Sequence, residues 1–338
     1  MTWGEALAHR RNALGWSQER LAQQLGITRQ SLIALEHDKR LPTLALAIKL
    51  ANLFNLSLDD LVKPLAPEYS RQEDRWRWFG AKPSFPTLVV WAQLHDATVL
   101  VPSMLLAASR LPDALWNPES EVLTPLPSAR DPKRVTLIGG CDPYLAWIRD
   151  LYEEQRPGYW IEPLRLSSQT AIASFTQGLL HVAGSHLFDP STRQYNIIDF
   201  PMAVTRVHYL TWDEGLIRHP EASAVRQIAI REPGSEAHSL FLRHQNSITW
   251  PSDVFYSHQS ILEQVQHHPD WAGVGLGSLA ATNGLLFEPW AQESYDLWIR
   301  TEDLKSVWGR SLLDVLASAA LHNLFGHIPH LVLSGSSP

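Results

Sequence analysis

The sequence predicts a multidomain protein, with an all-α head of five short helices followed by a larger α/β domain. Up to Lys63, apolar residues recur at helical spacing, and residues that start or stop helices separate the segments. From residue 87 onward, extended apolar stretches alternate with helical ones, which is typical of an α/β fold with mainly parallel strands. We therefore expect a head over 1–63 and an α/β domain over 87–332.

The segment between them, residues 64–86, is expected to be a linker. It holds four prolines and a charged run, and it shows no apolar period. Trp76, Trp78 and Phe79 are too apolar to remain in solvent, so we expect them to dock on one of the domains.

Charge is distributed unevenly between the two predicted domains. The 338-residue chain has a net charge of −7, which by itself argues against a nucleic-acid partner. The first 63 residues, however, carry eight Lys or Arg and six Asp or Glu, a net of +2, and the remainder carries 20 against 29, a net of −9. A basic head on an acidic body suits a small DNA-binding domain that carries a second module.

Cellular location is predicted from what the sequence lacks. Cys141 is the single cysteine, so an intramolecular disulfide is excluded and a reducing compartment is favoured. The sequence begins MTWGEALAHRR, without the apolar core of a signal peptide, and no stretch reaches membrane-spanning length. We expect a cytoplasmic protein without a membrane partner.

The head has a capping residue at each predicted helix boundary. Ser17, Thr28, Thr43 and Ser57 are placed to cap helices two to five. The predicted helices cover 3–14, 17–25, 28–36, 43–54 and 57–62, with Gly15 and Gly26 as stops. The predicted core is Leu21, Leu25, Ile27, Leu32, Leu35, Leu44, Ile48, Leu50, Leu53 and Leu61.

A tight turn at Gly26 and Ile27 joins the second and third helices, so that the third can enter a major groove. The head resembles the phage-repressor or Cro-type helix-turn-helix family over residues 3–63. This resemblance implies a homodimer that binds double-stranded DNA. The matching residues are Arg11, Gln18, Leu21, Ala22, Gly26, Ser31, Ile33, Leu35, Glu36, Pro42 and Leu50.

Candidate DNA-binding residues follow from position on these helices. Gln18 is expected to donate to a phosphate, and Arg29 and Gln30 suit guanine and adenine edges. The alternative for all of them is an ordinary solvated surface. The full candidate set is Gln18, Thr28, Arg29, Gln30, Ser31, Lys39 and Arg40, the last two as phosphate contacts. Arg11 and Glu36 match a pair that is usually an internal ion pair in this family.

Three strand-to-helix turns of the α/β domain are rich in small or hydroxyl residues, at 139–142, 166–169 and 233–236. Backbone N–H groups at such turns can cradle an anion. The domain resembles the periplasmic-binding-protein-like, molybdate-type (type II) domain, in the segments 139–145, 167–189, 195–196, 231–238, 257–258, 272–290 and 293–299. The resemblance implies two lobes that close on a small ligand, with crossings near 205–211 and 289–295.

The candidate ligand-binding residues are Cys141, Asp142, Ser167, Ser168, Gln169, Arg231, Gly234, Ser235, Glu236, His258 and Tyr295. Each hydroxyl either contacts a ligand or only caps a helix, and Arg231 either clamps a ligand or joins the lobes in an ion pair. Family members carry Asn-Arg, two residues, then Gly-Ser-Gly-Thr-Arg. Here Glu236, Ala237 and His238 replace the last three, and Ile230 replaces the Asn.

The added carboxylate disfavours molybdate or tungstate by about a few kcal/mol if it faces the ligand. The ligand is then an oxyanion, a less anionic metabolite, or none, and Glu236 pointing into solvent would restore the oxyanion. We expect no metal site, because His181, His186, His238 and His258 lack metal-ligand spacing. No cofactor is expected.

Three functions are consistent with these residues. The first is a one-component transcriptional regulator that a small molecule controls. The second is a DNA-binding protein whose large domain serves only dimerisation or protein contacts. The third is an enzyme, which we do not expect, because no nucleophile elbow, phosphate loop or paired metal ligands are present in the sequence.

Overall fold

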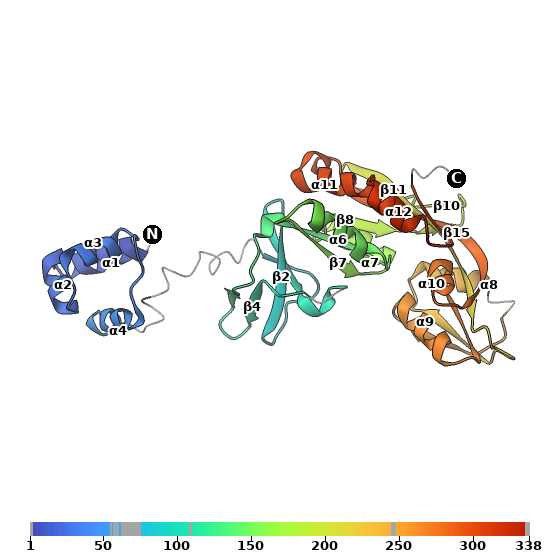
Figure 1. Ribbon diagram of the computed structural model, residues 1–338, viewed down its shortest axis with the longest axis horizontal. Helices are drawn as coiled ribbons and strands as arrows, with labels where there is room; N and C mark the ends of the chain where they lie inside the picture. Colours follow the sequence, from blue (N-terminus) through green and yellow to red (C-terminus); the bar gives the residue numbers. More distant parts are fainter. Residues whose placement is uncertain are drawn as a thin grey trace. The chain divides into compact units, whose positions relative to one another are not determined.

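A computed structural model describes two compact units, Met1–Asp74 and Arg75–Pro338 (Figure 1). The described residues are 3–54, 56, 61, 76–107, 110–244 and 248–334. Within them, no helix has both the length and the apolar character that crossing a membrane requires.

The first unit contains the helical head, whose predicted caps are confirmed at three helices. Ser17, Thr28 and Thr43 each accept a hydrogen bond from the backbone N–H three residues later, at 3.2, 3.1 and 3.3 Å. Gly26 ends its helix in the left-handed conformation, with φ of 71°. The helices are α1 (Trp3–Ala13), α2 (Gln18–Leu25), α3 (Arg29–Glu36) and α4 (Leu44–Leu53). The predicted fifth helix lies outside the described residues, except for Leu61.

The core of the head forms where α1, α2, α3 and α4 meet. Leu21, Leu32 and Leu50 are fully buried in it, as predicted. Ile48 was a wrong prediction, because it lies on the outer face of α4 and is 46% exposed. Helices α1 and α3 cross so closely at Gly4 that a Cβ there would lie 2.4 Å from the Glu36 carbonyl oxygen.

Gly4→Ala provides a first testable prediction. The obstructing atom is backbone, so α1 and α3 must move apart, and a cost of about 1–3 kcal/mol is expected for this overpacking. Thermal unfolding of the variant measures it. Gly15 also lies in the head and has open space around its Cα, but its φ of 65° makes it unsuitable as a control. Ala13→Gly, at the end of the same helix, is a better one.

The second unit begins with a five-stranded sheet, in the order β1-β3-β2-β4-β5. Trp76 and Trp78 lie on β1 and pack with Trp116, so these tryptophans dock on the second unit. The segment expected to be a linker therefore contributes a strand. From residue 87 onward helical stretches were expected to alternate with strands, but after residue 102 the structure has a short 3-10 turn and a hairpin. The strands are β1 (Trp76–Trp78), β2 (Thr87–Leu94), β3 (Ala97–Pro102), β4 (Ala114–Asn117) and β5 (Val122–Pro125).

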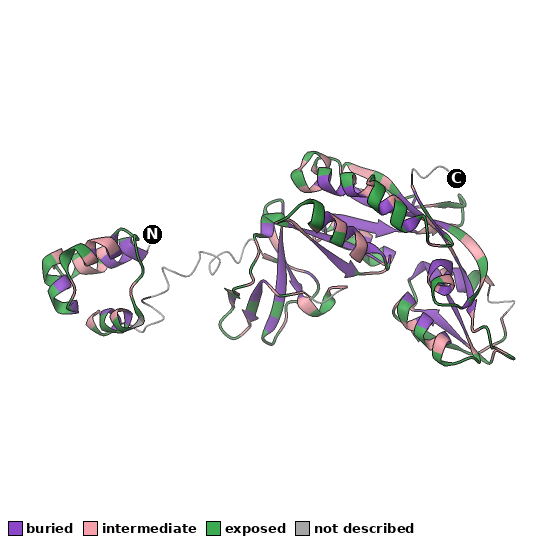
Figure 2. Cartoon of the chain, viewed as in Figure 1, coloured by how far each residue is buried: buried purple, intermediate pink, exposed green. Residues whose placement is uncertain are grey.

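A nine-stranded mixed sheet forms the two lobes (Figures 1 and 2). The first lobe contains three parallel strands and two helices: β6 (Val135–Gly140), β7 (Trp160–Arg165), β8 (Val182–Ser185), α6 (Leu145–Gln155) and α7 (Ser168–Thr176). The second contains β12 (Gln227–Arg231), β13 (Ser252–Phe255), β14 (Trp271–Leu276), α8 (Glu236–His244), α9 (His258–His267) and α10 (Gly277–Thr282).

Two long antiparallel strands, β11 (Val204–Arg218) and β15 (Leu286–Arg300), cross between the lobes. Their ladder shifts register at Glu214 and Gly215, where a Cβ on Gly215 would lie 2.1 Å from the Glu288 carbonyl oxygen. The predicted crossings, near 205–211 and 289–295, fall on these two strands. Glu214 lies at this shift in register, on the stretch of β11 that runs between the two lobes.

The C-terminal helices close the core of the first lobe. Leu312, Val315 and Leu321 are fully buried there, so the apolar face of these helices packs on the domain itself. The elements are α11 (Val307–Leu316), α12 (Ala319–Phe325) and β16 (Leu331–Leu333), and β16 pairs with β11. Shorter elements are η4 (Ser103–Leu105), η5 (Pro132–Arg134), η7 (Asp303–Lys305), β9 (Phe188–Asp189) and β10 (Gln194–Tyr195).

Candidate functional site

Helix α3 presents its first turn to solvent. Thr28, Arg29 and Gln30 are exposed, and Ser31 is half-buried. The Thr28 hydroxyl caps the helix and also donates to Ser31 Oγ at 2.9 Å. Arg29 and Gln30 are therefore free of the capping network and project from the start of the helix, which is the part of a recognition helix that contacts base edges.

Gln18 lies in an internal polar network. Arg11 Nε and Glu36 Oε1 are 2.6 Å apart in the ion pair that the sequence indicated. Gln18 Nε2 donates to the other Glu36 oxygen at 2.8 Å. Gln18 thus holds α2 against α3, and its phosphate contact remains a prediction.

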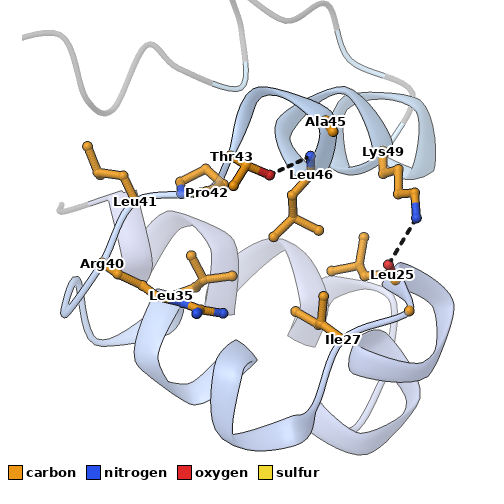
Figure 3. Close-up of a pocket in the computed structure, with 11 residues that line it drawn as sticks. Leu25, Ile27, Leu35, Arg40, Leu41, Pro42, Thr43, Ala45, Leu46 and Lys49 are labelled. Carbon is orange, nitrogen blue, oxygen red and sulfur yellow. Dashed lines mark hydrogen bonds between the residues drawn. The ribbon is translucent and has the colours of Figure 1, made fainter.

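Lys39 and Arg40 follow α3 and are exposed. Arg40 also lines a pocket of about 310 Å³ between α3 and α4 (Figure 3). Lys49 closes one side of this pocket by donating to the Leu25 carbonyl at 3.4 Å. Arg40 is exposed beside α4, and its phosphate contact remains a prediction.

A cleft of about 210 Å³ opens between the lobes of the second unit. It lies at the carboxyl ends of strands, where ligands bind in open α/β sheets. Five of the eleven candidate ligand residues line it: Cys141, Asp142, Ser167, Arg231 and His258. Its other lining residues are Pro143, Arg165, Leu166, Glu232, Tyr256, Ser257 and Gln259.

The candidate hydroxyls are engaged in capping. Ser167 accepts from Thr170 N–H at 3.2 Å, and Ser235 accepts from His238 N–H at 3.2 Å while it donates to the Glu232 carbonyl. Ser168 is buried and accepts from His186 N–H at 3.2 Å. Of the three candidate serines, Ser167 both caps its helix and lines the cleft, as does Ser257 at the start of α9, which was not a candidate.

The remaining candidates lie near the cleft but do not line it. Gln169 is exposed and faces the second lobe, since a Cβ on Gly234 would lie 3.5 Å from Gln169 Oε1. Tyr295 is fully buried, and its hydroxyl lies so close to the backbone that a Cβ on Gly140 or Gly184 would be about 2 Å from it.

The charged candidates form ion pairs within the second lobe. Arg231 pairs with its neighbour Glu232 at 2.7 Å, so it does not join the lobes. Glu236 is 6% exposed, pairs with Arg243 at 2.9 Å and accepts from Phe188 N–H. Its orientation toward solvent is therefore excluded, and the carboxylate stays near the lobe interface.

Several buried polar groups beneath the cleft have no hydrogen-bond partner. Among the described residues these include Asp142 Oδ2, His258 Nδ1 and the Tyr295 hydroxyl. Burial raises the pKa of Asp142 to about 7, against the hydrogen bond from Tyr144 N–H that lowers it. Buried polar atoms are normally satisfied, so each exception requires an explanation such as a bound ligand or ion.

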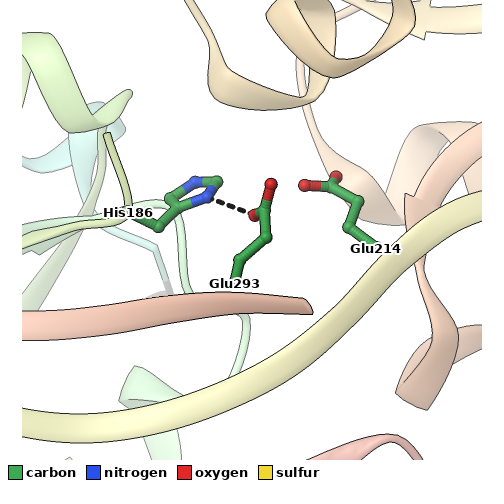
Figure 4. Close-up of side chains that lie close together, drawn as sticks. All are labelled: His186, Glu214 and Glu293. Atoms are coloured by element: carbon green, nitrogen blue, oxygen red, sulfur yellow. Dashed lines mark hydrogen bonds and ion pairs between the residues drawn. The ribbon is translucent and has the colours of Figure 1, made fainter. Parts of the chain in front are cut away.

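Two of these atoms, the carboxylate oxygens of Glu214, belong to the junction cluster, defined as His186, Glu214 and Glu293 (Figure 4). His186 follows β8, Glu214 lies on β11 and Glu293 on β15. One ligand atom from each lies within 4.8 Å of the other two, and all three side chains are buried. The structure thus brings together a possible metal-ligand set that the sequence did not indicate.

The two carboxylates of the junction cluster differ in their hydrogen bonds. His186 Nδ1 and Trp212 Nε1 lie 2.6 and 3.1 Å from Glu293 Oε2. Among the described residues, neither Glu214 oxygen has a hydrogen-bond partner. Burial, followed by repulsion from Glu293, raises the pKa of Glu214. Burial also acts to raise the pKa of Glu293, but His186 outweighs it and lowers that pKa.

Sequence reasoning missed Glu214 completely and did not link Glu293 to His186. Glu214 stands beside Asp213 in the stretch LTWDEGLI, where two acidic residues within an otherwise largely apolar strand were the available signal. Register explains the proximity, because Trp212 is opposite Glu293 and Glu214 lies two residues further on the same face.

Residues 149–317 match the profile described as a PBP superfamily domain. The chain belongs to the PBP superfamily. Residues 7–61 match a helix-turn-helix profile, so the helical head is a helix-turn-helix domain. Both family expectations from the sequence are confirmed.

Curated relatives of this PBP superfamily member match its helix-turn-helix domain. An uncharacterised HTH-type transcriptional regulator of Bacillus subtilis is 37% identical over 51 residues, which is 15% of this chain and 77% of the relative. Another, from Methanocaldococcus jannaschii, is 44% identical over 45 residues, 13% and 68% of the two chains. The protein is a DNA-binding transcriptional regulator with a PBP domain.

Solved structures similar to the PBP domain include a phosphate ABC transporter substrate-binding protein of Clostridium perfringens. It is 14% identical, with a TM-score of 0.48 over 59% of this chain and 99% of that one. The regulatory domain of a transcriptional activator in Pseudomonas aeruginosa is 12% identical, with a TM-score of 0.42 over 54% and 98%.

Proposed function

We propose that the protein is a one-component regulator that binds operator DNA as a homodimer and is controlled by a small ligand held between its lobes. The observation that carries this proposal is the cleft, which residues from both lobes line and beneath which buried polar groups lack partners. A ligand that contacts both lobes favours their closed arrangement, and this differential affinity is what a switch requires.

Charge at the cleft favours a ligand that is not a multiply charged oxyanion. Two carboxylates line it, Asp142 and Glu232, and Glu214 lies 3.8 Å from the cleft residue His258. Two cations also line it: Arg231, which pairs with Glu232, and the exposed Arg165. Because Arg165 and Arg231 only balance Asp142 and Glu232, a dianion would enter a cleft whose lining has no surplus of positive charge to neutralise it. The substitutions in this chain's 231–238 segment argue against molybdate or tungstate in the same way.

The test is a thermal-shift screen of the full chain against oxyanions, neutral metabolites and cations, followed by DNA binding with any compound that stabilises it. A true effector at 100 times its Kd stabilises the folded state by about 2.7 kcal/mol. We expect cations or neutral compounds to raise the Tm and molybdate, sulfate and phosphate to leave it unchanged. Stabilisation by molybdate would contradict the proposed ligand class.

The second candidate function is a PBP domain that serves only dimerisation or protein contacts. Two ion pairs favour this function. Arg231, which matches the family's arginine, is already paired with Glu232, and Glu236 is paired with Arg243, so neither side chain is available to an anion. It predicts a stable dimer and sequence-specific DNA binding that no compound in the screen changes. Light scattering on the full chain, with and without DNA, measures the dimer.

Arg29→Ala is expected to weaken specific DNA binding by about 1–3 kcal/mol, because a bidentate contact with guanine is lost. The operator is first selected from random-sequence DNA with the wild-type chain. Affinity is then measured by fluorescence anisotropy on that site and on a scrambled one. Arg226→Ala removes an exposed arginine of the second unit and serves as the control. Equal losses on both DNAs would show that Arg29 contacts phosphate only.

A further inference from the structure

The junction cluster has the donor set of a metal site. Its ligand atoms come from three different elements, two of them the strands that cross between the lobes. Donors at about 2.0–2.2 Å from one ion can be no more than about 4.4 Å apart. Ligand atoms that all lie within 4.8 Å of one another therefore need only small rotations to share a single ion. An organic cation would need more room between them.

Glu214 is the second, independent observation. Its side chain is 0% exposed and both carboxylate oxygens lack a partner, although Figure 4 shows the group facing the Glu293 carboxylate. Two buried carboxylates facing each other repel, and an unpaired buried charge costs several kcal/mol. A cation between them removes both penalties. His258 Nδ1, also buried and without a partner, lies 3.8 Å from Glu214 Oε1 and aims a further donor at the same place.

The groups around the cluster orient its ligands. Cys141 Sγ lies 3.1 Å from His186 Nε2, so that Nδ1 remains the ring atom that faces Glu293. Trp212 Nε1 donates to Glu293 Oε2. Such outer contacts, which fix ring and carboxylate orientation, accompany most histidine–carboxylate metal sites.

We propose that His186, Glu214 and Glu293 bind one divalent first-row transition-metal cation, and that this cation is the effector of the regulator. One imidazole and two carboxylates suit Mn²⁺, Fe²⁺, Co²⁺, Ni²⁺ or Zn²⁺, and the two negative charges neutralise the ion. Because Glu214 and Glu293 lie on the crossing strands, the ion ties β11 to β15 and to the turn after β8 at the point where the lobes meet. Its role as effector rests on the function proposed above.

The binding test uses the full chain, stripped of metal with a chelator and titrated separately with Mn²⁺, Co²⁺ and Zn²⁺ by calorimetry. We expect one ion per chain. Glu214→Gln and Glu293→Gln should each weaken binding about 100-fold or more, since loss of an outer-shell partner alone costs about 10–100-fold. Glu288→Gln changes an exposed glutamate on β15, the strand that holds Glu293, and this variant should bind the metal as the wild type does. No saturable binding, or equal affinity in all variants, overturns the site.

Stability of the stripped protein gives a second readout that does not depend on the metal chosen. Glu214→Gln replaces the unpartnered carboxyl group by a neutral amide of the same shape, so its metal-free Tm should be equal to or above that of the wild type, while the rise in Tm with metal should disappear. A metal-free Glu214→Gln variant that unfolds far below the wild type overturns the proposal, because Glu214 would then be held by protein contacts instead of an ion.

DNA binding separates the two proposals. A metal that binds at the cluster and changes operator affinity supports both. A metal that binds without changing operator affinity retains the site and overturns its role as effector. If no metal binds but another compound alters operator affinity, the regulator proposal stands and the metal site is overturned.

Discussion

Arg130→Met should destabilise the second unit by about 3–5 kcal/mol, because it leaves two buried carboxylates without their cation. The guanidinium donates to Asp113 through Nε and Nη2, at 2.9 and 2.8 Å, and its Nη1 pairs with Glu162. Asp113 is fully buried and Glu162 is 1% exposed. Since Asp113 also accepts from Trp91 N–H on β2, and Glu162 lies on β7, this arginine fastens the five-stranded sheet to the first lobe.

The measurement is urea unfolding of the wild type and the variant, with circular dichroism as the signal that reports unfolding. Arg218→Met is the matched control, because it breaks a 3.7 Å pair with Glu288 in which both side chains are about half exposed. Exposed pairs contribute about 0–1 kcal/mol. Arg110 Nε remains 3.0 Å from Glu162 in the Arg130 variant and relieves part of the loss. If Arg130→Met cost no more than Arg218→Met, the network would not be what joins the two sheets.

Local signals explain which parts of the fold the sequence could predict. Ser17, Thr28 and Gly26 act through neighbours a few residues away, so helix boundaries in the head followed directly from residue type. The alternation of strands and helices within each lobe of the PBP domain was likewise apparent from apolar runs, whereas β11 was expected only as a crossing between the lobes. Strand β1 was not apparent, because Trp76–Trp78 is only three residues long and is defined by pairing with β3, about twenty residues later.

The candidate site was less predictable because its chemistry depends on long-range register. His186 and Glu293 are 107 positions apart in the chain, yet their side chains share a 2.6 Å contact. Spacing rules for metal ligands apply to residues on one element, so they could not find a set spread over three. The capping serines were predicted, but a side chain's choice between capping and ligand binding depends on which way the turn faces.

His181 makes the second unit sensitive to acid. Its ring is buried, with Nδ1 accepting from Leu137 N–H at 3.0 Å and Nε2 lying 3.2 Å from the Gln93 carbonyl. Burial lowers the pKa of His181 from 6.5 to about 3, and the positive charges at His95 and Arg300 act in the same direction. The unfolded chain therefore takes up a proton below about pH 6.5 that the folded chain does not. The stabilisation from neutral His181 is complete above that pH and is lost as the pH falls toward 3.

The expected loss is about 2 kcal/mol between pH 7 and pH 5, since each pKa unit is worth about 1.36 kcal/mol. Asp142 opposes it in wild-type curves, because burial raises the pKa of that carboxyl to about 7 and the folded state then gains stability as the pH falls. The informative quantity is thus the difference between wild type and His181→Gln, which keeps a donor and an acceptor but cannot be charged.

Urea unfolding is measured at pH 5, 6, 7 and 8. At pH 8 His181→Gln should be less stable than the wild type, and at pH 5 the difference in unfolding free energy should be smaller by about 2 kcal/mol. His267→Gln, at the exposed end of α9, should follow the wild-type curve at every pH, because an exposed ring meets water in both states. A gap that stays constant from pH 8 to pH 5 would mean that His181 takes up its proton in the folded protein. The strand that holds it beside Gln93 would then open in acid before the unit unfolds.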